Sequence, residues 1–90
     1  MRLAHFGITL AQFQNLAPYS TLRQGTGQQE VRIQLREHAP VVSSKTPEST
    51  TYRFVGRQSS AGPSMDVANY ITFDKKGEST EPWEVLKEDS

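Results

Sequence analysis

The residues of this chain that could perform acid–base, nucleophilic or metal chemistry do not form a catalytic set. The two histidines, His5 and His38, have no partner histidine or carboxylate at ligand or catalytic spacing. Asp66 and Asp74 share a face of a predicted strand, but eight residues of strand span about 26 Å, too far for an acid–base pair. No serine lies in a Gly-x-Ser-x-Gly motif, and the chain has no cysteine. We therefore expect no enzymatic activity, and no catalytic residue, metal, cofactor or small-molecule substrate.

Arginine is the residue type whose spacing does suggest a chemical role. Arg32 and Arg36 alternate with apolar residues in one predicted strand, and Arg53 and Arg57 do so in another. Four guanidinium groups are therefore expected on one face of a sheet, with Tyr70 of a third strand available to stack on a base. Two interpretations follow. These five residues bind RNA or DNA, or they form a solvated face that discourages aggregation of the sheet.

Three segments predict the strands that would position these side chains. Residues 31–35 and 51–55 alternate between apolar and polar residues, and residues 67–73 are rich in β-branched and aromatic residues. The connections, residues 38–48 and 58–64, are rich in serine and contain proline, and neither has a helical period. Because a parallel pair needs a longer crossover, these connections favour an antiparallel sheet of three or more strands.

The N-terminal part of the chain predicts a short amphipathic helix. Apolar residues recur three apart within residues 8–17, Thr9 followed by Gln12 fits a capping box, and Pro18 ends the pattern.

A second short helix is expected near the C-terminal end of the sequence. The segment Ser79-Thr80-Glu81-Pro82 has the composition of a helix start, and Trp83 and Leu86 would face the sheet. The expected fold class is therefore α+β, with a small antiparallel sheet, a short N-terminal helix and a short C-terminal helix.

Size and charge suggest a single small domain, residues 1–90, with a thin core. Residues 23–29 are predicted to be a flexible Gly/Gln-rich connector. The formal net charge of zero combines nine basic and five acidic residues in positions 1–77 with one basic and five acidic residues in the acidic C-terminal segment, positions 78–90. Opposite charges on two parts of one chain favour contact between those parts, within one chain or between copies, and we expect a homo-oligomer or larger assembly.

The acidic C-terminal segment also contains a candidate protein interface, formed by Trp83, Glu84 and Leu86. Tryptophan is enriched at interfaces, so an adaptor or inhibitor that docks another protein through this segment is an alternative function. Packing of Trp83 on its own sheet is the competing interpretation.

The order of features between residues 30 and 88 resembles that of single-stranded RNA bacteriophage coat proteins. Alternating strands lead to a tyrosine-centred strand ending near Phe73, followed by Ser-Thr-Glu-Pro-Trp-Glu. The resemblance implies an antiparallel sheet with C-terminal helices, an interlocked dimer and an RNA hairpin bound on the sheet face. Two features differ from the family. This chain begins with a helical period where the family has a hairpin, and its expected C-terminal helix is shorter than the helices of the family. We therefore transfer no RNA-contacting residue.

The leading hypothesis is a non-enzymatic structural or assembly subunit that self-associates, of the kind found in virus or phage particles. No run approaches the ~20 apolar residues of a membrane span, and the first residues do not form a secretion signal. We therefore expect a cytoplasmic location or one within a virus particle, and no membrane partner.

Overall fold

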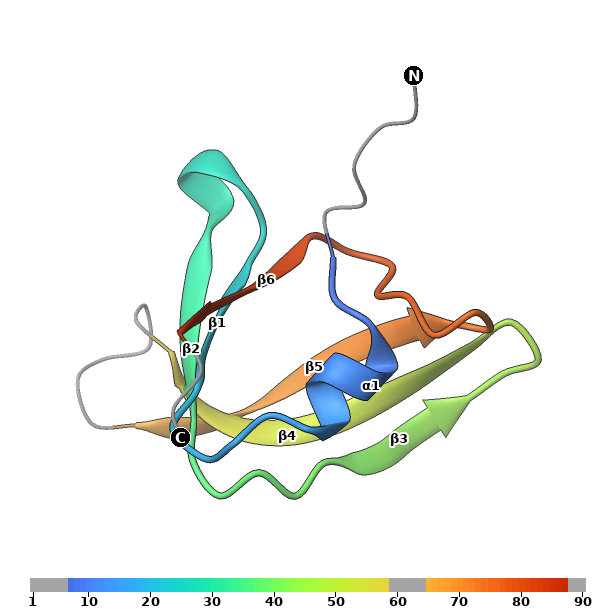
Figure 1. The fold of residues 1–90 in the computed structure, drawn as a ribbon, viewed down its shortest axis with the longest axis horizontal. Coiled ribbons are helices and arrows are strands. Elements are labelled where there is room, and N and C mark those ends of the chain that lie inside the picture. Colours follow the sequence, from blue (N-terminus) through green and yellow to red (C-terminus); the bar gives the residue numbers. More distant parts are fainter. Residues whose placement is uncertain (1–6, 59–64, 88–90) are drawn as a thin grey trace.

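The computed structural model describes residues 7–58 and 65–87. Along the chain these form α1 (Leu10–Gln14), β1 (Thr21–Gln24), the 3-10 helix η1 (Gly27–Gln29), β2 (Val31–Leu35), β3 (Val41–Lys45), β4 (Ser49–Gln58), β5 (Asp66–Asp74) and β6 (Trp83–Lys87) (Figure 1). His5, most of the predicted connection 58–64 and residues 88–90 of the acidic C-terminal segment lie outside the described residues. No helix in the described part of the chain is long and apolar enough to cross a membrane.

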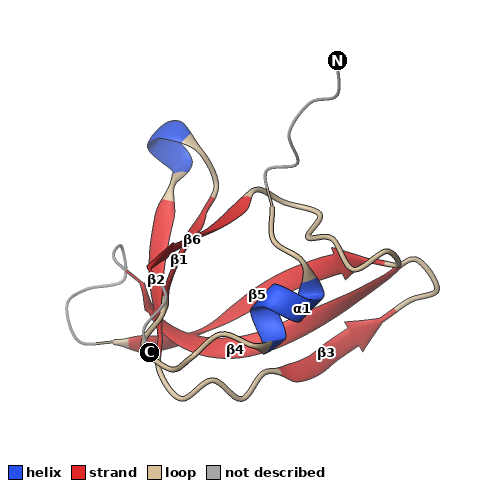
Figure 2. Ribbon diagram, in the orientation of Figure 1, coloured by secondary structure: helices blue, strands red, loops and turns tan. Residues whose placement is uncertain are grey.

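The strands form an antiparallel sheet in the order β3-β4-β2-β1-β6, and β5 pairs with the other edge of β4 (Figure 2). β4 is the longest strand, and its neighbours change along its length. Its first half pairs with β3, its last residues pair with β2, and β5 follows it from Ser49 to Arg57. The prediction of an antiparallel sheet is therefore confirmed.

The core lies between this sheet and α1, which crosses the face of β4 and β5 (Figure 1). Phe13 of α1 is fully buried, and its ring lies 5.4 Å from the ring of Phe54 and 5.5 Å from that of Phe73. Burying an aromatic side chain stabilises a fold by roughly 1.5–3 kcal/mol. The buried apolar residues are Ile8, Phe13, Leu16, Leu22, Ile33, Leu35, Phe54, Ile71, Phe73 and Trp83.

The N-terminal helix has the predicted capping box. The Gln12 N–H donates to Thr9 Oγ1 at 3.1 Å, and the Thr9 N–H donates to Gln12 Oε1 at 2.8 Å. These bonds satisfy two donors that a helix leaves unpaired at its start. The helix is shorter than the predicted range of residues 8–17, because it ends at Gln14.

The predicted α+β class with two helices is wrong, because the structure is mostly antiparallel sheet with one short helix and one 3-10 turn in its described part. The segment expected as a C-terminal helix forms β6, which pairs with β1. Trp83 is 3% exposed and Val85 is partly buried, so alternate residues face the core as strand geometry requires. Leu86, three residues after Trp83, lies at a β-bulge and not on a helical face.

Two further strands lie where the sequence predicted irregular structure. β3 occupies the middle of the predicted loop 38–48, and all five of its residues are exposed. β1 includes the first residues of the predicted connector 23–29, whose remainder forms η1 and the turn into β2. Gly25 allows this turn: its φ is +84°, and a Cβ at this position would lie 2.7 Å from the Gln29 carbonyl oxygen.

Candidate interaction surface

We call the side of β3, β4 and β5 that faces away from α1 the outer face. The register places Arg53 of β4 between Val41 of β3 and Tyr70 of β5. Val41 is 53% exposed and Tyr70 is 51% exposed, and Val55 and Ala68 form the next exposed pair. The predicted alternation of β4 and the predicted position of Tyr70 on the same face are confirmed, because these residues lie opposite the buried ones. The outer face thus presents apolar and aromatic side chains around the Arg53 guanidinium.

Three predicted arginines, Arg36, Arg53 and Arg57, share this face, but their charges are not equally available. Asp66, the first residue of β5, lies 3.2 Å from Arg57 Nε and 3.7 Å from Arg36 Nε. One carboxylate therefore partly neutralises two arginines. Arg53 has no ion pair among the described residues. The fourth predicted arginine, Arg32, lies near the start of β2 and pairs with Glu30 at 3.0 Å.

A groove of about 360 Å³ opens on this face where the neighbour of β4 changes. β2 pairs with residues 56–58 of β4 and β3 pairs with residues 50–53, so residues 54–55 have no partner strand on that edge. The chain between β2 and β3 leaves the sheet at this point. The groove lining includes Arg36, Glu37, Ala39, Val41, Arg53 and Val55. Its lining combines apolar side chains with side chains of both charges.

Arg36 is held at this groove by three different contacts. Its guanidinium carbon lies 5.0 Å from the centre of the Tyr19 ring, its Nη1 lies 3.5 Å from Gln34 Oε1, and its Nε lies near Asp66. Tyr19 has a φ of +69°, which is unusual for an aromatic residue. Its N–H donates to the Leu35 carbonyl at 3.1 Å, so this backbone conformation places the ring beside the end of β2.

The three residues predicted as an interface in the acidic C-terminal segment do not form a common exposed surface. Trp83 lies in the core, where its ring is 6.1 Å from that of Phe54. Glu84 is exposed and pairs with Arg23 of β1. Leu86 is 37% exposed at the β-bulge. The interpretation that Trp83 packs on its own sheet is the one the structure supports.

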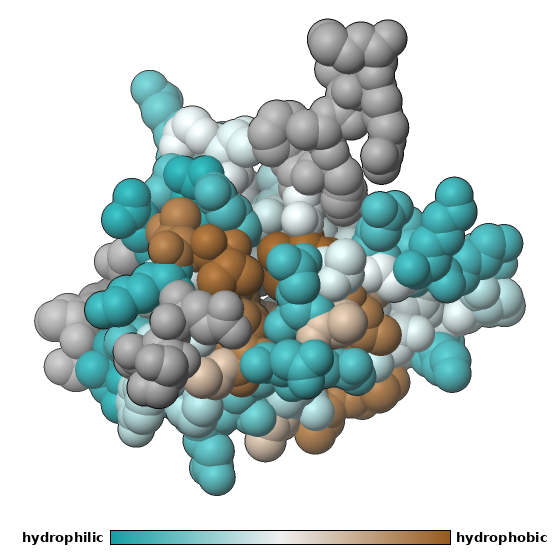
Figure 3. Space-filling model, in the orientation of Figure 1, coloured by the Kyte–Doolittle hydropathy of each residue, from teal (hydrophilic) through white to brown (hydrophobic). Residues whose placement is uncertain are grey.

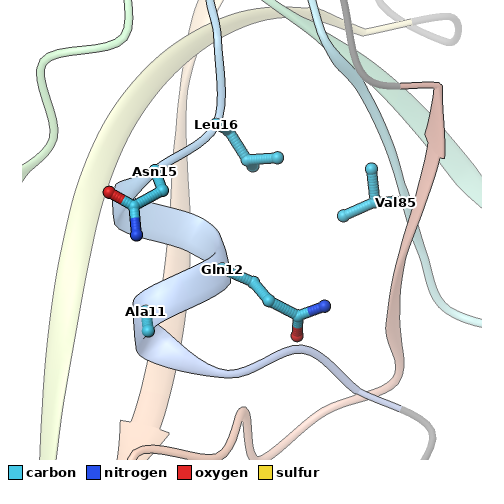
Figure 4. Close-up of a pocket in the computed structure, with 5 residues that line it drawn as sticks. All are labelled: Ala11, Gln12, Asn15, Leu16 and Val85. Atoms are coloured by element: carbon cyan, nitrogen blue, oxygen red, sulfur yellow. The ribbon is translucent and has the colours of Figure 1, made fainter.

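A second groove, of about 380 Å³, separates α1 from β6. Leu16 and Val85 point toward each other across it, Gln12 also points into it, and the Asn15 amide points away (Figure 4). Apolar surface gathers over β6 and beside α1 around this opening (Figure 3). The Gln12 side-chain oxygen already accepts from the Thr9 N–H, so this groove presents few free polar groups.

His38 and Asp74 hold local structure. The His38 Nε2 lies 2.7 Å from the Phe13 carbonyl oxygen, its ring packs edge-on to Phe13, and its Nδ1 is buried without a hydrogen-bond partner. The backbone N–H groups of Glu78 and Lys76 donate to Asp74 Oδ1, and these bonds lower the pKa of that carboxyl, the bond from Glu78 most strongly. In residues 7–58 and 65–87, no group of three or more acidic or histidine side chains could hold a metal ion.

The sequence prediction missed two residues of the outer face, Val41 and Glu37. Val41 lies in the segment 38–48 that was expected to be a loop, Glu37 directly precedes that segment, and neither belongs to an alternating pattern. A signal was present for Val41, because it begins a β-branched pair between Pro40 and a polar run. Comparisons of the chain with models of protein families, with curated proteins and with solved structures find no match.

Proposed function

We propose that this protein is a non-enzymatic assembly subunit that self-associates through its outer face. The observation that carries this proposal is the exposed row of Val41, Arg53 and Tyr70 across three neighbouring strands. Tyrosine and arginine are the residue types that most often dominate binding at protein interfaces. Their position side by side on neighbouring strands, with valines beside them, supports contact with another protein surface.

The size of the molecule is compatible with such an interface. A stable protein–protein contact usually buries about 800 Å² on each partner, which is roughly one eighth of the 6048 Å² that this chain exposes. A buried tyrosine supplies about 150–250 Å² of this area with few rotatable bonds to order. An interface of this size on the outer face would use residues that are already exposed, such as Val41, Val55 and Tyr70.

A nucleic-acid-binding face has less support from the same residues. Strong phosphate binding needs several cationic side chains that are free to replace counterions. Arg36 and Arg57 share Asp66, and Arg32 lies beside Glu30, so most of the predicted arginines already face a carboxylate. Arg53 with Tyr70 remains, and this pair is better suited to a protein surface than to a phosphate backbone.

A binding function also accounts for the positions of the groups that could perform catalysis. His38 is engaged with the Phe13 carbonyl and packs against its ring. Asp66 faces two guanidinium groups, and Asp74 accepts backbone N–H groups within its own turn. These contacts use the imidazole and the carboxylates to hold the fold.

Light scattering after size-exclusion chromatography tests the proposal, with two adjacent valines as a matched pair. Val41 and Val42 are 53% and 55% exposed, but Val41 shares the side of Arg53 and Val42 the side of Tyr52. We expect oligomers of the unaltered chain in the micromolar range, lost in Val41→Ser and retained in Val42→Ser. The proposal would be contradicted if the unaltered chain is a monomer throughout the micromolar range at low salt. It would also be contradicted if the two substitutions change the oligomeric state equally. Binding of an RNA or DNA oligonucleotide that weakens steeply with salt would instead favour the nucleic-acid alternative.

A further inference from the structure

We infer that the self-association is a two-fold dimer in which Arg53 of each copy pairs with Glu37 of the other copy. This inference rests on the proposed function and specifies its partner, its symmetry and its charged contacts. It follows from two charged side chains of the outer-face groove that have no ion pair among the described residues.

Glu37 and Arg53 line the same groove and carry opposite charges. Neither has an ion pair among the described residues, so their charged groups lie more than the 4.0 Å of such a contact from each other. Glu37 is exposed, and so is Arg53. Each side chain is therefore available to a group from outside its own chain.

A second copy is the partner that matches both charges at once. In a two-fold interface, if residue i contacts residue j of the other copy, then j contacts i in return. A two-fold axis that lies in the interface, parallel to the outer face and midway between Arg53 and Glu37 at right angles to the line joining them, places each charge opposite its counterpart in the other copy. One contact type then occurs twice, and neither charge of the pair is left without a partner in the interface.

The remaining net positive charge of each face lies beside a carboxylate of its own chain. The cluster of Arg36, Arg57 and Asp66 carries one net positive charge. Arg57 lies four residues along β4 from Arg53, which corresponds to about 13 Å of strand. Arg53 and Glu37 are therefore the groove charges that a second copy can pair, while Arg36 and Arg57 stay beside Asp66 of their own chain.

The apolar residues beside Arg53 would make these ion pairs effective. Val41 and Tyr70 lie on the strands on either side of it, and Ala39 and Val55 also line the region. Contact between two such faces excludes water from the pairs, and close charge pairs within protein interfaces show large coupling energies. Exposed pairs without such cover contribute little.

Charge reversal tests the pairing directly. R53E and E37R each place like charges opposite one another twice, so we expect each to raise the dimer dissociation constant by at least about tenfold. The double variant E37R/R53E restores opposite charges, and we expect its dissociation constant to return to within about threefold of the original. An equimolar mixture of R53E and E37R should form a two-chain complex by mass, because both contacts between the different chains become attractive.

Two matched controls carry the same charge changes outside the groove. Lys45→Glu reverses a charge on β3, and Glu48→Arg reverses one in the turn between β3 and β4. Both residues are exposed, and neither has an ion pair within the described part of the chain. We expect both controls to dimerise as the unaltered chain does. Circular dichroism of every variant establishes that it is folded, and R53Q and E37Q replace a reversal that fails to fold.

The outcomes separate this inference from the proposed function. If the unaltered chain is monomeric, both fail. If it dimerises through Val41 but R53E and E37R leave the dissociation constant unchanged, self-association stands and the two-fold pairing is wrong. If each single variant weakens the dimer and neither the double variant nor the mixture restores it, the pairing is also wrong.

Discussion

The two faces of β4 and β5 are built from alternate residues of the same strands, and they differ in what covers them. On the inner face, Phe54 is 2% exposed and Phe73 is 1% exposed, because α1 places Phe13 against both rings. On the outer face, Val55 is 36% exposed and Tyr70 is 51% exposed, and no described element covers them. Strand alternation creates both faces, but only the inner one is closed within the chain. Stability and interaction are therefore expected to depend on different, interleaved residues.

Substitution of adjacent residues on the two faces should separate these roles most clearly. We expect Phe54→Ala to lower the free energy of unfolding by about 3–5 kcal/mol, because it leaves a cavity beside Phe13. Natural domains are stable by only about 5–15 kcal/mol, so this variant should be largely unfolded or close to it. Val55→Ala, one residue away, should change stability by about 0.5 kcal/mol or less. Urea denaturation measures both, and similar losses in the two variants would contradict the division between the faces.

A smaller loss is expected where the inner face leaves no room for a side chain. Gly56 is buried in β4, and a Cβ there would lie 2.5 Å from Ile33 Cγ2 and 3.1 Å from the Gln34 carbonyl oxygen. The carbonyl belongs to the paired β2 strand and cannot move freely. We therefore expect Gly56→Ala to cost about 1–3 kcal/mol of the free energy of unfolding. An unchanged denaturation midpoint would show that the contact between β2 and β4 is looser than the structure indicates.

The smallest effect on stability is expected at Asp74, the last residue of β5, which begins a turn. Its carboxylate accepts N–H groups from Glu78 at 3.0 Å and Lys76 at 2.9 Å, and these bonds lower its pKa below 3.8. A lowered pKa contributes stability that is complete above about pH 3.8 and is lost as the pH falls through the lowered value. Asp74→Asn should therefore lower the melting temperature at pH 7. The difference from the unaltered chain should shrink below pH 3.8, and a constant difference would contradict this assignment.

The parts of the fold that could be predicted are those where one short segment determines its own structure. The capping box of Thr9 and Gln12 is a local interaction, and its prediction was correct. The alternation in β2, β4 and β5 also gave the correct faces, because each of these strands has one buried and one exposed side.

The strands that were missed depend on partners distant in the sequence. All residues of β3 are exposed, so it has no apolar alternation, and it is a strand because β4 supplies its hydrogen bonds. β6 was predicted as a helix from Pro82 and from the spacing of Trp83 and Leu86. The edge of β1 and a β-bulge at Leu86 give the same residues a strand conformation.

The sequence predicted which residues share the interaction surface, but not which of its arginines are paired with a carboxylate. Arg53 and Tyr70 could be assigned to one face from alternation, and the register places them side by side. The neutralisation of Arg36 and Arg57 by Asp66 could not be foreseen, because it requires the pairing of three strands. Cross-strand register thus decides which arginine remains available to a partner.

The position of β4 between β5 on one edge and β3 and β2 on the other has a consequence for the motions of the domain. Its amide hydrogens are protected on both sides along most of its length, so they can exchange with solvent only when several strands separate together. The outer edges of β3 and β6 need only a local opening. A second copy that docks against the outer face would slow this collective opening without touching the backbone of β4, since it would bind the folded form alone.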